Sequence, residues 1–348
     1  MSSDCRDVKL SICITTFNRR NFIGATLRSI LDQCTDECEL LVLDGGSTDD
    51  TELVVSEYVG RSRHLRYVRR SENGGFDLDC DCAVHLAIGQ YCWLMTDDDL
   101  LKPGAVAAVL DALRQDPSLV IVNAELRDFE MRRILQPRWL NFGSDRLYRG
   151  TETDRLFAEV GDFLKYIGGV VIKRRTWISR DRKSYYGSLF LHLGVIFQDQ
   201  LPGDALVIAR PYISYRIGNS HTFSPNMFET FMIKWPALVW SLAPSDAAKR
   251  KVCSLEPWRE FHELLQRRGL GYYSLNEYRR WIRPQLRSFR EKLIPVFVAL
   301  LPGVLVNAFF MVYYSLAANP GRSAWYPELR KQMLRGSRFH FRNWRISQ

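Results

Sequence analysis

The stretch Tyr91-Cys-Trp-Leu-Met-Thr-Asp-Asp-Asp-Leu-Leu101 decides the fold of this chain. Its first five residues form an apolar run that is short enough to be a buried parallel strand. Three acids follow at once, and Pro103 stands at the expected start of a helix. Acids at the carboxyl end of a central strand lie where open α/β sheets bind ligands, and they repel one another. Mg²⁺ or Mn²⁺ would relieve that repulsion, since such ions take one or two protein carboxylates plus substrate phosphates. The acids therefore predict a metal site, in preference to a solvated turn in which one Asp caps the next helix.

Strands and helices alternate along the chain on the N-terminal side of this stretch. The apolar patterns predict strands at 10–17, 39–44, 65–68 and 91–95, and helices at 22–33, 51–58 and 79–88. Such an alternation implies a mostly parallel sheet with right-handed crossovers. The predicted fold class is therefore α/β, a doubly wound nucleotide-binding sheet.

Specific polar groups follow the first two strands. Thr15, Thr16 and Asn18 lie at the end of the first strand, and Asp44 and Ser47 lie at the end of the second. A carboxylate at the second strand end can accept hydrogen bonds from a nucleobase or a ribose. The sequence lacks the GxGxxG motif of dinucleotide sites, which argues against a dehydrogenase. The simpler alternative for Asp44 is a plain turn cap.

Composition describes a folded protein with an anionic partner. The chain has 348 residues, 46% of them hydrophobic and 25% charged, which allows a large core and two domains. Its formal net charge of +9 fits a nucleotide, a membrane or a nucleic acid, but no nucleic-acid-binding module is recognisable. Eight cysteines without a CxxC pair suggest reduced cytosolic thiols, and the polar N-terminus suggests no signal peptide.

Four motifs in register carry a resemblance to a known family. They are Thr15-Thr-Phe-Asn-Arg19, Asp44-Gly-Gly-Ser-Thr-Asp-Asp-Thr51, Asn73-Gly-Gly75 and Asp97-Asp-Asp99. In this order and spacing they resemble the family 2 inverting glycosyltransferases of the GT-A fold, and within them the abequosyltransferase-like branch of O-antigen and surface-polysaccharide enzymes. The resemblance is dense over residues 8–115 and thinner to about 225.

The resemblance implies a nucleotide-sugar donor, a divalent cofactor (Mn²⁺ or Mg²⁺) and a set of site residues. The metal ligands it implies are Asp97, Asp99 and His221. The donor-binding residues it implies are Thr15, Thr16, Phe17, Asn18, Arg19, Asp44, Ser47, Asn73, Gly74, Gly75, Asp77, Asp97, Asp98 and Arg216. Arg216 and His221 fall in the segment 215–221, which resembles a loop that closes over the diphosphate; an ordinary surface loop is the alternative.

The general base is less well marked than the donor site. Many relatives carry a Glu-Asp pair near the apolar stretch 188–197, and this chain has none. His192 aligns with that pair, and its ordinary pKa near neutrality suits a base. A core histidine in an apolar helix is the alternative, and Asp181 and Asp199 are the other candidates.

The C-terminal third differs in character from the rest of the chain. Residues 279–292 hold six basic residues and one acid among apolar ones, which predicts an interfacial helix on an anionic membrane. Residues 293–318 carry no charge, but Pro295, Pro302-Gly303 and Asn307 interrupt them. A broken re-entrant or in-plane hairpin with both basic flanks in the cytosol fits best. A spanning segment and a buried helical pair are the alternatives. A chain cut at about Glu277 should then be soluble and still bind the donor.

These observations predict a catalytic domain over residues 8–225, divided into a nucleotide-sugar half (8–115) and an acceptor half (116–225). A helical membrane-associating region would follow over 226–348. The expected function is metal-dependent, inverting sugar transfer to a lipid-linked oligosaccharide at the cytoplasmic face of a bacterial inner membrane, without nucleic acid. One alternative is a nucleotidyltransferase, which would need a glycine- and lysine-rich loop where this chain has Phe17 to Asn21. Another is a catalytically silent membrane scaffold.

Overall fold

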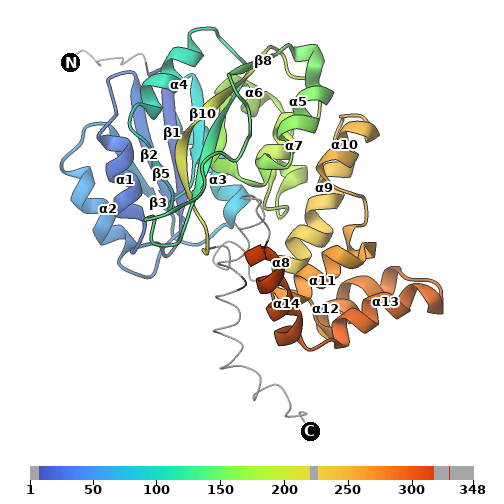
Figure 1. Ribbon diagram of the computed structural model, residues 1–348. Coiled ribbons are helices and arrows are strands. Elements are labelled where there is room, and N and C mark those ends of the chain that lie inside the picture. The colour runs from blue at the N-terminus through green and yellow to red at the C-terminus, as the bar shows by residue number, and fades with distance from the viewer. Residues whose placement is uncertain (1–7, 220–225, 317–328, 330–348) are drawn as a thin grey trace. The chain divides into compact units, whose positions relative to one another are not determined.

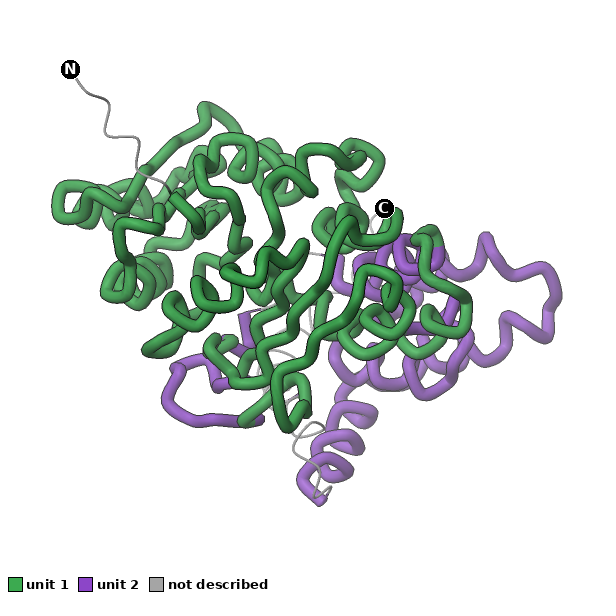
Figure 2. The backbone as a smooth tube through the Cα atoms, turned by 90° about the horizontal axis from the view of Figure 1, so that it is seen from above, with its two compact units in different colours: residues 1–125, 137–215, 241–252 green, residues 126–136, 216–240, 253–348 purple. Residues whose placement is uncertain are grey.

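The computed structural model describes residues 8–219 and 226–316 together with Leu329. The chain forms two compact units, coloured separately in Figure 2. Unit 1 comprises residues 1–125, 137–215 and 241–252, and unit 2 comprises 126–136, 216–240 and 253–348. The units therefore do not follow a single cut near residue 225. Residues 126–136 belong to unit 2 although unit 1 precedes and follows them in the sequence. Residues 241–252 likewise belong to unit 1 although unit 2 precedes and follows them.

The first half of the sheet in unit 1 is parallel. Its strands are β3 (Leu65–Arg69), β2 (Cys38–Asp44), β1 (Leu10–Thr16) and β4 (Tyr91–Met95), in that spatial order. β1 pairs in parallel with both β2 and β4, and β2 pairs in parallel with β3. All five residues of β4 are buried, as its apolar sequence requires. The doubly wound sheet predicted for the nucleotide-binding half is confirmed.

Helices cover both faces of this parallel half. Figure 1 shows α1 (Ile23–Leu31) and α2 (Thr51–Val59) on one side of the sheet and α3 (Phe76–Leu86) on the other. α3 begins at Phe76, three residues earlier than the sequence pattern predicts. Asp77 therefore lies in the first turn of a helix rather than in a loop.

The second half of the sheet is antiparallel where its pairing is defined. Beyond β4 the order continues through β9 (Val170–Lys173), β6 (Leu119–Arg127), β10 (Ala205–Arg216) and β5 (Leu100–Leu101). β9 runs antiparallel to both β4 and β6, and β5 runs antiparallel to β10. Two short strands, β7 (Ile134–Gln136) and β8 (Arg146–Tyr148), pair antiparallel with β6 and β10. The acids after β4 thus lie where the two halves of the sheet meet.

Short helices pack around this second half. They are α4 (Ala105–Leu113), α5 (Thr153–Val160), α6 (Arg174–Ser179), α7 (Leu191–Phe197) and α10 (Asp246–Val252), with 3₁₀ turns η1 (Gly150–Glu152), η2 (Phe163–Lys165), η3 (Ile167–Gly169) and η4 (Lys183–Tyr185). Every residue of α7 is buried. A helix that is apolar on all sides belongs inside the protein, and α7 is such a helix.

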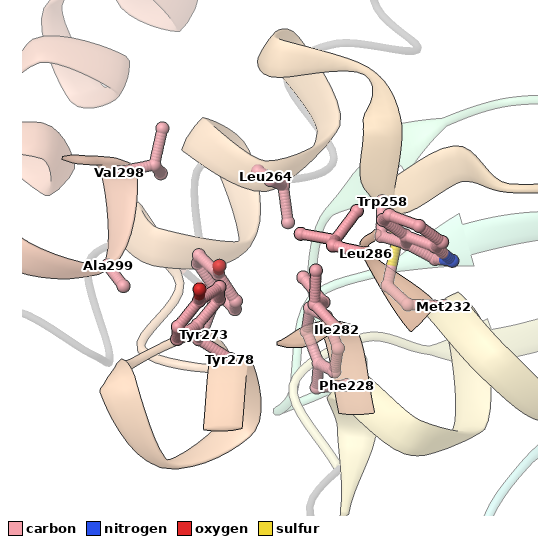
Figure 3. Packing of buried hydrophobic residues seen from close by; sticks show 10 residues of the cluster. All are labelled: Phe228, Met232, Trp258, Leu264, Tyr273, Tyr278, Ile282, Leu286, Val298 and Ala299. Carbon is pink, nitrogen blue, oxygen red and sulfur yellow. The ribbon is translucent and has the colours of Figure 1, made fainter. Parts of the chain in front are cut away.

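Unit 2 is largely helical. Its helices are α8 (Met227–Glu229), α9 (Trp235–Ser241), α11 (Phe261–Gly269), α12 (Leu275–Glu277), α13 (Phe289–Leu300) and α14 (Gly303–Leu316), with π-helical turns η6 (Thr230–Lys234) and η8 (Tyr278–Ile282) and 3₁₀ turns η7 (Pro257–Arg259) and η9 (Arg283–Gln285). Figure 3 shows its buried centre, which we call the unit 2 core: Phe228, Met232, Trp258, Leu264, Tyr273, Tyr278, Ile282, Leu286, Val298 and Ala299.

The uncharged C-terminal stretch is broken, as predicted. Among the described residues no single helix has the length and apolar character needed to cross a membrane. α13 and α14 meet those criteria only as a pair, and the pair is bent by 84°. Pro302, which lacks a backbone N–H, stands between the two helices and explains the break.

Candidate active site

The ends of β1 and β2 are joined by a network centred on Asn18. Its side-chain oxygen accepts hydrogen bonds from the backbone N–H groups of Thr48 (2.8 Å) and Asp49 (3.2 Å). Its own N–H donates to the hydroxyl of Ser47 at 2.9 Å. Asn18 adopts a positive φ of 56°, which asparagine tolerates better than most residues. Asn18 and Ser47 therefore shape the loops around the site, a role that their positions in the sequence did not reveal.

Asp44 is completely buried at the end of β2. One carboxylate oxygen accepts the N–H of Ser47 (2.8 Å), and the other accepts the hydroxyl of Tyr67 (2.6 Å). Burial raises the pKa of Tyr67, and its hydrogen bond to Asp44 raises it further. Asp44 thus caps its own turn and holds the hydroxyl of Tyr67.

The end of β1 and the residues after it carry one exposed aromatic ring and several less exposed polar groups. Phe17 is 41% exposed, so one part of its ring is open to a ligand. Thr15 contacts Cys80 through its hydroxyl at 3.7 Å, and the carbonyl of Thr16 accepts the N–H of Gly45 at 2.9 Å. Arg19 lies with its Nε 3.3 Å from a carboxylate oxygen of Asp97. Arg19 therefore balances the charge of the acid cluster.

The three acids after β4 lie in a poorly solvated place. Asp97 is 8% exposed, Asp99 is 1% exposed, and Asp98 is partly exposed. Burial raises the pKa of Asp97 to about 7, with Asp98 raising it further and Arg19 opposing the shift. Thr96 donates a 2.6 Å hydrogen bond to the carboxylate of Asp99 and so fixes its orientation. Negative charge concentrated away from water is the environment that a cation stabilises.

These acids suit a hard divalent ion that shares its coordination with a diphosphate. The described residues contain no group of three or more His, Cys, Asp or Glu side chains placed to hold a metal by themselves. Mg²⁺ and Mn²⁺ take oxygen ligands, and one or two carboxylates suffice when substrate phosphates supply others. Asp97 pairs with Arg19 and Asp99 accepts the hydroxyl of Thr96, so both acids are held in place as candidate ligands. His221 lies outside the described residues.

Asp77 ties α3 to the start of α7. Its two carboxylate oxygens accept the backbone N–H groups of Leu189 (2.9 Å) and Leu191 (3.3 Å), and the residue is 3% exposed. Just before it, Asn73 accepts the N–H of Gly75 at 2.8 Å, and Gly75 has a φ of 87° that favours glycine. Gly74 lies against Arg70, which forms an ion pair with Asp79. Both oxygens of Asp77 therefore serve the protein's own backbone.

His192 has the environment of a core histidine. It is 1% exposed within α7, and its Nε2 lies 2.8 Å from the carbonyl oxygen of Leu164, to which it donates. Burial lowers the pKa of His192 to about 4, so the ring is neutral at physiological pH. The Nδ1 of this ring has no hydrogen-bond partner, but it is buried with the rest of the side chain, where a substrate does not reach it. The structure therefore favours the alternative of a core residue.

Asp181 and Asp199 lie near the other end of α7. Gln198, the residue after that helix, bonds the backbone N–H of Asp181 at 3.0 Å and its carbonyl at 2.9 Å. Asp199 follows directly and accepts the N–H of Gln200 at 2.7 Å. α7 has seven residues, so it is about 10 Å long. Asp77 holds the opposite end of that helix, and both acids are exposed to solvent.

Arg216 belongs to a strand, which corrects the prediction of a loop from residue 215. Tyr215 and Arg216 are the last two residues of β10. The Arg216 guanidinium donates to the carbonyl of Phe129 and lies 6.0 Å from the centre of that ring. Arg216 is assigned to unit 2, whereas the acid cluster is in unit 1.

Sequence reasoning missed an aromatic group beside Asp99. Trp139 stacks on Tyr166 with ring centres 5.8 Å apart, and Tyr215 meets these two rings at 5.2 and 4.9 Å. Phe163 packs edge-on against Trp139 at 5.2 Å. Burial, together with the neighbouring Asp99 carboxylate, raises the pKa of Tyr166 well above its usual value. We call these four residues the aromatic group; they are scattered over 77 positions of sequence, so no local motif marks them.

The sequence of this chain is similar to sequences of known glycosyltransferases. Residues 11–178 match the family described as Glycosyl transferase family 2. The chain is 26% identical over 229 residues to an abequosyltransferase, RfbV, of Salmonella typhimurium. That alignment covers 62% of this chain and 68% of the abequosyltransferase.

Solved structures share the fold. Staphylococcus aureus TarS, residues 1–349 in complex with UDP-GlcNAc, matches with a TM-score of 0.53 at 15% identity, over 94% of this chain and 92% of that one. The mannosyltransferase PcManGT of Pyrobaculum calidifontis, in complex with GDP-Man and Mn²⁺, matches with a TM-score of 0.52 at 13% identity, over 96% and 88%. At these identities the likeness concerns the fold, a mixed α/β architecture of the GT-A type.

Proposed function

Since the chain belongs to the family 2 glycosyltransferases, we propose that it transfers a sugar from a nucleotide-sugar donor to a hydroxyl group of a lipid-linked saccharide. The reaction is metal-dependent and inverts the anomeric carbon. The observation that carries this proposal is the pair of buried acids, Asp97 and Asp99, at the carboxyl end of the central strand β4. Ligands of open α/β sheets bind at that edge.

Donor binding rests on the ends of β1, β2 and β4. In this proposal Thr15, the exposed ring of Phe17 and Asp44 contact the nucleoside, and the acid cluster faces the diphosphate. Two structural neighbours were solved with nucleotide sugars, UDP-GlcNAc and GDP-Man, which supports this class of donor. The Asn18 network holds the first two strand ends together, so these contacts come from a preorganised edge.

The chemistry requires that a diphosphate leave while an acceptor hydroxyl attacks in line. A divalent ion held by Asp99 and Asp97 would stabilise the charge that develops on the leaving diphosphate. Thr96 fixes the rotamer of Asp99, and Arg19 offsets part of the charge of Asp97. These contacts position the acids before the donor arrives.

The acceptor contacts the aromatic group. Sugar rings present apolar C–H faces that pack well on aromatic rings, and Trp139 is half-buried beside Tyr166, next to Asp99. An acceptor stacked there would lie near the metal end of the donor. The similarity to an abequosyltransferase supports a role in bacterial surface-polysaccharide synthesis. We propose that the reaction takes place at the cytoplasmic face of a bacterial inner membrane.

A panel of nucleotide sugars tests the proposal. UDP-, GDP-, dTDP- and CDP-sugars are added to the full-length chain with Mn²⁺ or with EDTA, and the melting temperature is measured. A ligand at about a hundred times its Kd stabilises the folded state by about 2.7 kcal/mol, so one nucleotide class should raise the melting temperature, and by more with Mn²⁺ than with EDTA. Release of nucleoside diphosphate from that donor would then confirm transferase chemistry. Release of pyrophosphate would indicate a nucleotidyltransferase, and no response to any nucleotide would indicate a silent scaffold.

A further inference from the structure

Helices α13 and α14 of unit 2 each expose a row of apolar side chains to solvent. Their outward side chains are large and apolar, and several are more than half exposed, among them Phe289 at 76% and Leu305 at 66%. We call this surface the outer apolar face. It comprises Phe289, Leu293, Ile294, Phe297 and Leu300 of α13 and Val304, Leu305, Phe309, Val312, Tyr313 and Leu316 of α14.

The opposite side of each helix is already buried. Val298 and Ala299 of α13 belong to the unit 2 core, and Val306 and Phe310 of α14 belong to a second buried cluster. Asn307, also buried, donates to the carbonyl of Gly269 at 2.9 Å and so fastens α14 to α11. Each helix therefore has two apolar sides, of which one packs in a buried cluster and the other is exposed. Among the residues that the structure describes, none of unit 2 buries the outer apolar face.

Basic side chains precede this face along the chain. Arg279, Arg280, Arg283, Arg287 and Arg290 are all exposed, and Glu291 is the one acid in the sequence from 279 to 316. Arg280 lies over the ring of Trp281 at 4.8 Å, an amphipathic pairing that suits a boundary between water and lipid. Two copies of unit 2 meeting through this region would bring like charges together. An anionic lipid surface would instead neutralise them.

The lengths of α13 and α14 and the bend between them bear on how the pair would lie in a bilayer. At 1.5 Å per residue, α13 with 12 residues spans about 18 Å and α14 with 14 residues about 21 Å. Each is shorter than the roughly 30 Å hydrocarbon core of a bilayer, and the two diverge by 84°. Since the inner side of each is anchored in unit 2, the pair is suited to lie in the interface rather than cross it.

We propose that unit 2 is a monotopic docking module for anionic membranes. The outer apolar face enters the boundary between headgroups and acyl chains, and the arginines from 279 to 290 contact phosphate headgroups. The biological reason for docking rests on the proposed function, because a lipid-linked acceptor is reached only at a membrane. The surface itself is independent of that function.

Vesicle flotation of the purified full-length chain tests the proposal. Phosphatidylcholine vesicles with about a third phosphatidylglycerol should carry the wild-type chain even in high salt, because salt screens charge but not apolar burial. The double variant Phe297→Glu/Leu305→Glu should bind at least about tenfold more weakly. The matched control is Leu53→Glu, an equally exposed leucine on α2 of unit 1, which should bind as the wild type does.

A second variant separates charge from apolar burial. In Arg280→Gln/Arg283→Gln/Arg287→Gln the affinity for anionic vesicles should fall by about fivefold for each arginine removed. The same variant should bind pure phosphatidylcholine as weakly as the wild type does. An equal loss on both kinds of vesicle would contradict headgroup recognition by these arginines.

Three results would overturn the proposal. The first is a wild-type chain that stays unbound to anionic vesicles. The second is a C-terminal segment after α14 that becomes accessible to protease only when the vesicles are opened by detergent, which would indicate a spanning arrangement. The third is a dimer that Phe297→Glu/Leu305→Glu dissociates while neither chain binds vesicles, which would make the face a contact between copies. Donor-dependent melting shifts are measured in the same variants, so that membrane docking and donor binding are tested separately. A chain that floats with vesicles can fail to bind a donor, and a chain that binds a donor can fail to float.

Discussion

Asp99 is the residue on which the proposed reaction depends most. Asp99→Asn keeps the size of the side chain and an oxygen for the Thr96 hydroxyl but removes the charge. We expect turnover to fall by at least about a hundredfold and the Mn²⁺-dependent part of donor binding to disappear. Initial rates and melting shifts with and without Mn²⁺ measure both effects. Asp111→Asn, at an exposed position on α4, is the control.

Two results would contradict that role for Asp99. One is Mn²⁺-dependent donor binding that survives in Asp99→Asn. The other is wild-type turnover in excess EDTA. A variant with lost activity and a much lower melting temperature would show instead that Asp99 supports the fold.

His192 should matter for stability rather than chemistry. Its pKa is about 4 in the folded chain, below the ordinary value of about 6.5 that the unfolded chain has. The unfolded state therefore binds a proton first as the pH falls. The stability that the neutral ring provides is complete above about pH 6.5 and is lost between about pH 6.5 and 4, by about 3 kcal/mol.

Urea unfolding of wild type and His192→Gln between pH 7.5 and 4.5 measures this contribution. The wild type should lose more stability over that range than the variant, which has no group there to protonate. Donor turnover at pH 7.5 should fall no more than the folded fraction does. A loss of turnover by two or more orders of magnitude in a stably folded variant would restore His192 as the general base.

At the scale of elements, the contact between α3 and α7 organises the second half of the site. Asp77 in the first turn of α3 accepts two backbone N–H groups at the start of α7. Asp77→Ala removes the acceptor of one buried and one partly buried N–H group, so we expect a loss of about 2 kcal/mol in the free energy of unfolding. Asp50→Ala, which removes an exposed acid that pairs with Arg20, should change stability by less than about 0.5 kcal/mol.

Equilibrium unfolding in urea and donor titration together decide the role of Asp77. A destabilised variant that still binds donor when folded would confirm a contact between elements. Unchanged stability with lost donor affinity would assign Asp77 to the sugar instead, as the family resemblance implies.

At the scale of the whole molecule, the core of unit 2 is built from residues on both sides of the cut at Glu277. The unit 2 core joins Phe228 and Met232 to Ile282, Leu286 and Val298, far along the chain (Figure 3). A cut at Glu277 therefore removes half of a buried cluster and exposes the rest. This packing argues against the sequence-based prediction that such a fragment is soluble.

We expect a chain of residues 1–277 to aggregate or to melt far below the full-length protein. Gel filtration and thermal unfolding measure this. In the full-length chain, Ile282→Ala should cost about 2–5 kcal/mol because it leaves a cavity in the unit 2 core. Phe297→Ala at an exposed position should cost little. A monodisperse 1–277 fragment with the wild-type melting temperature would show that the core does not need its C-terminal members.

The sequence by itself determined the parallel half of the sheet and the place of the acids. Each βαβ step there is local: an apolar strand, a polar turn and an amphipathic helix follow within about 30 residues. The motifs after β1, β2 and β4 consequently converge at one edge whatever the rest of the chain does. The break at Pro302 was equally readable, because proline interrupts a helix through its own chemistry.

Only the tertiary structure decided which polar groups are free to act. His192 is buried in α7, and both oxygens of Asp77 accept backbone N–H groups. Trp139 stacks on Tyr166, beside Asp99. All three arrangements depend on contacts between residues far apart in the sequence. The antiparallel second half of the sheet and the two-sided α13–α14 pair depend on the same kind of contact. Burial and hydrogen-bond partners come from segments remote in sequence, and periodicity within one segment carries no information about them.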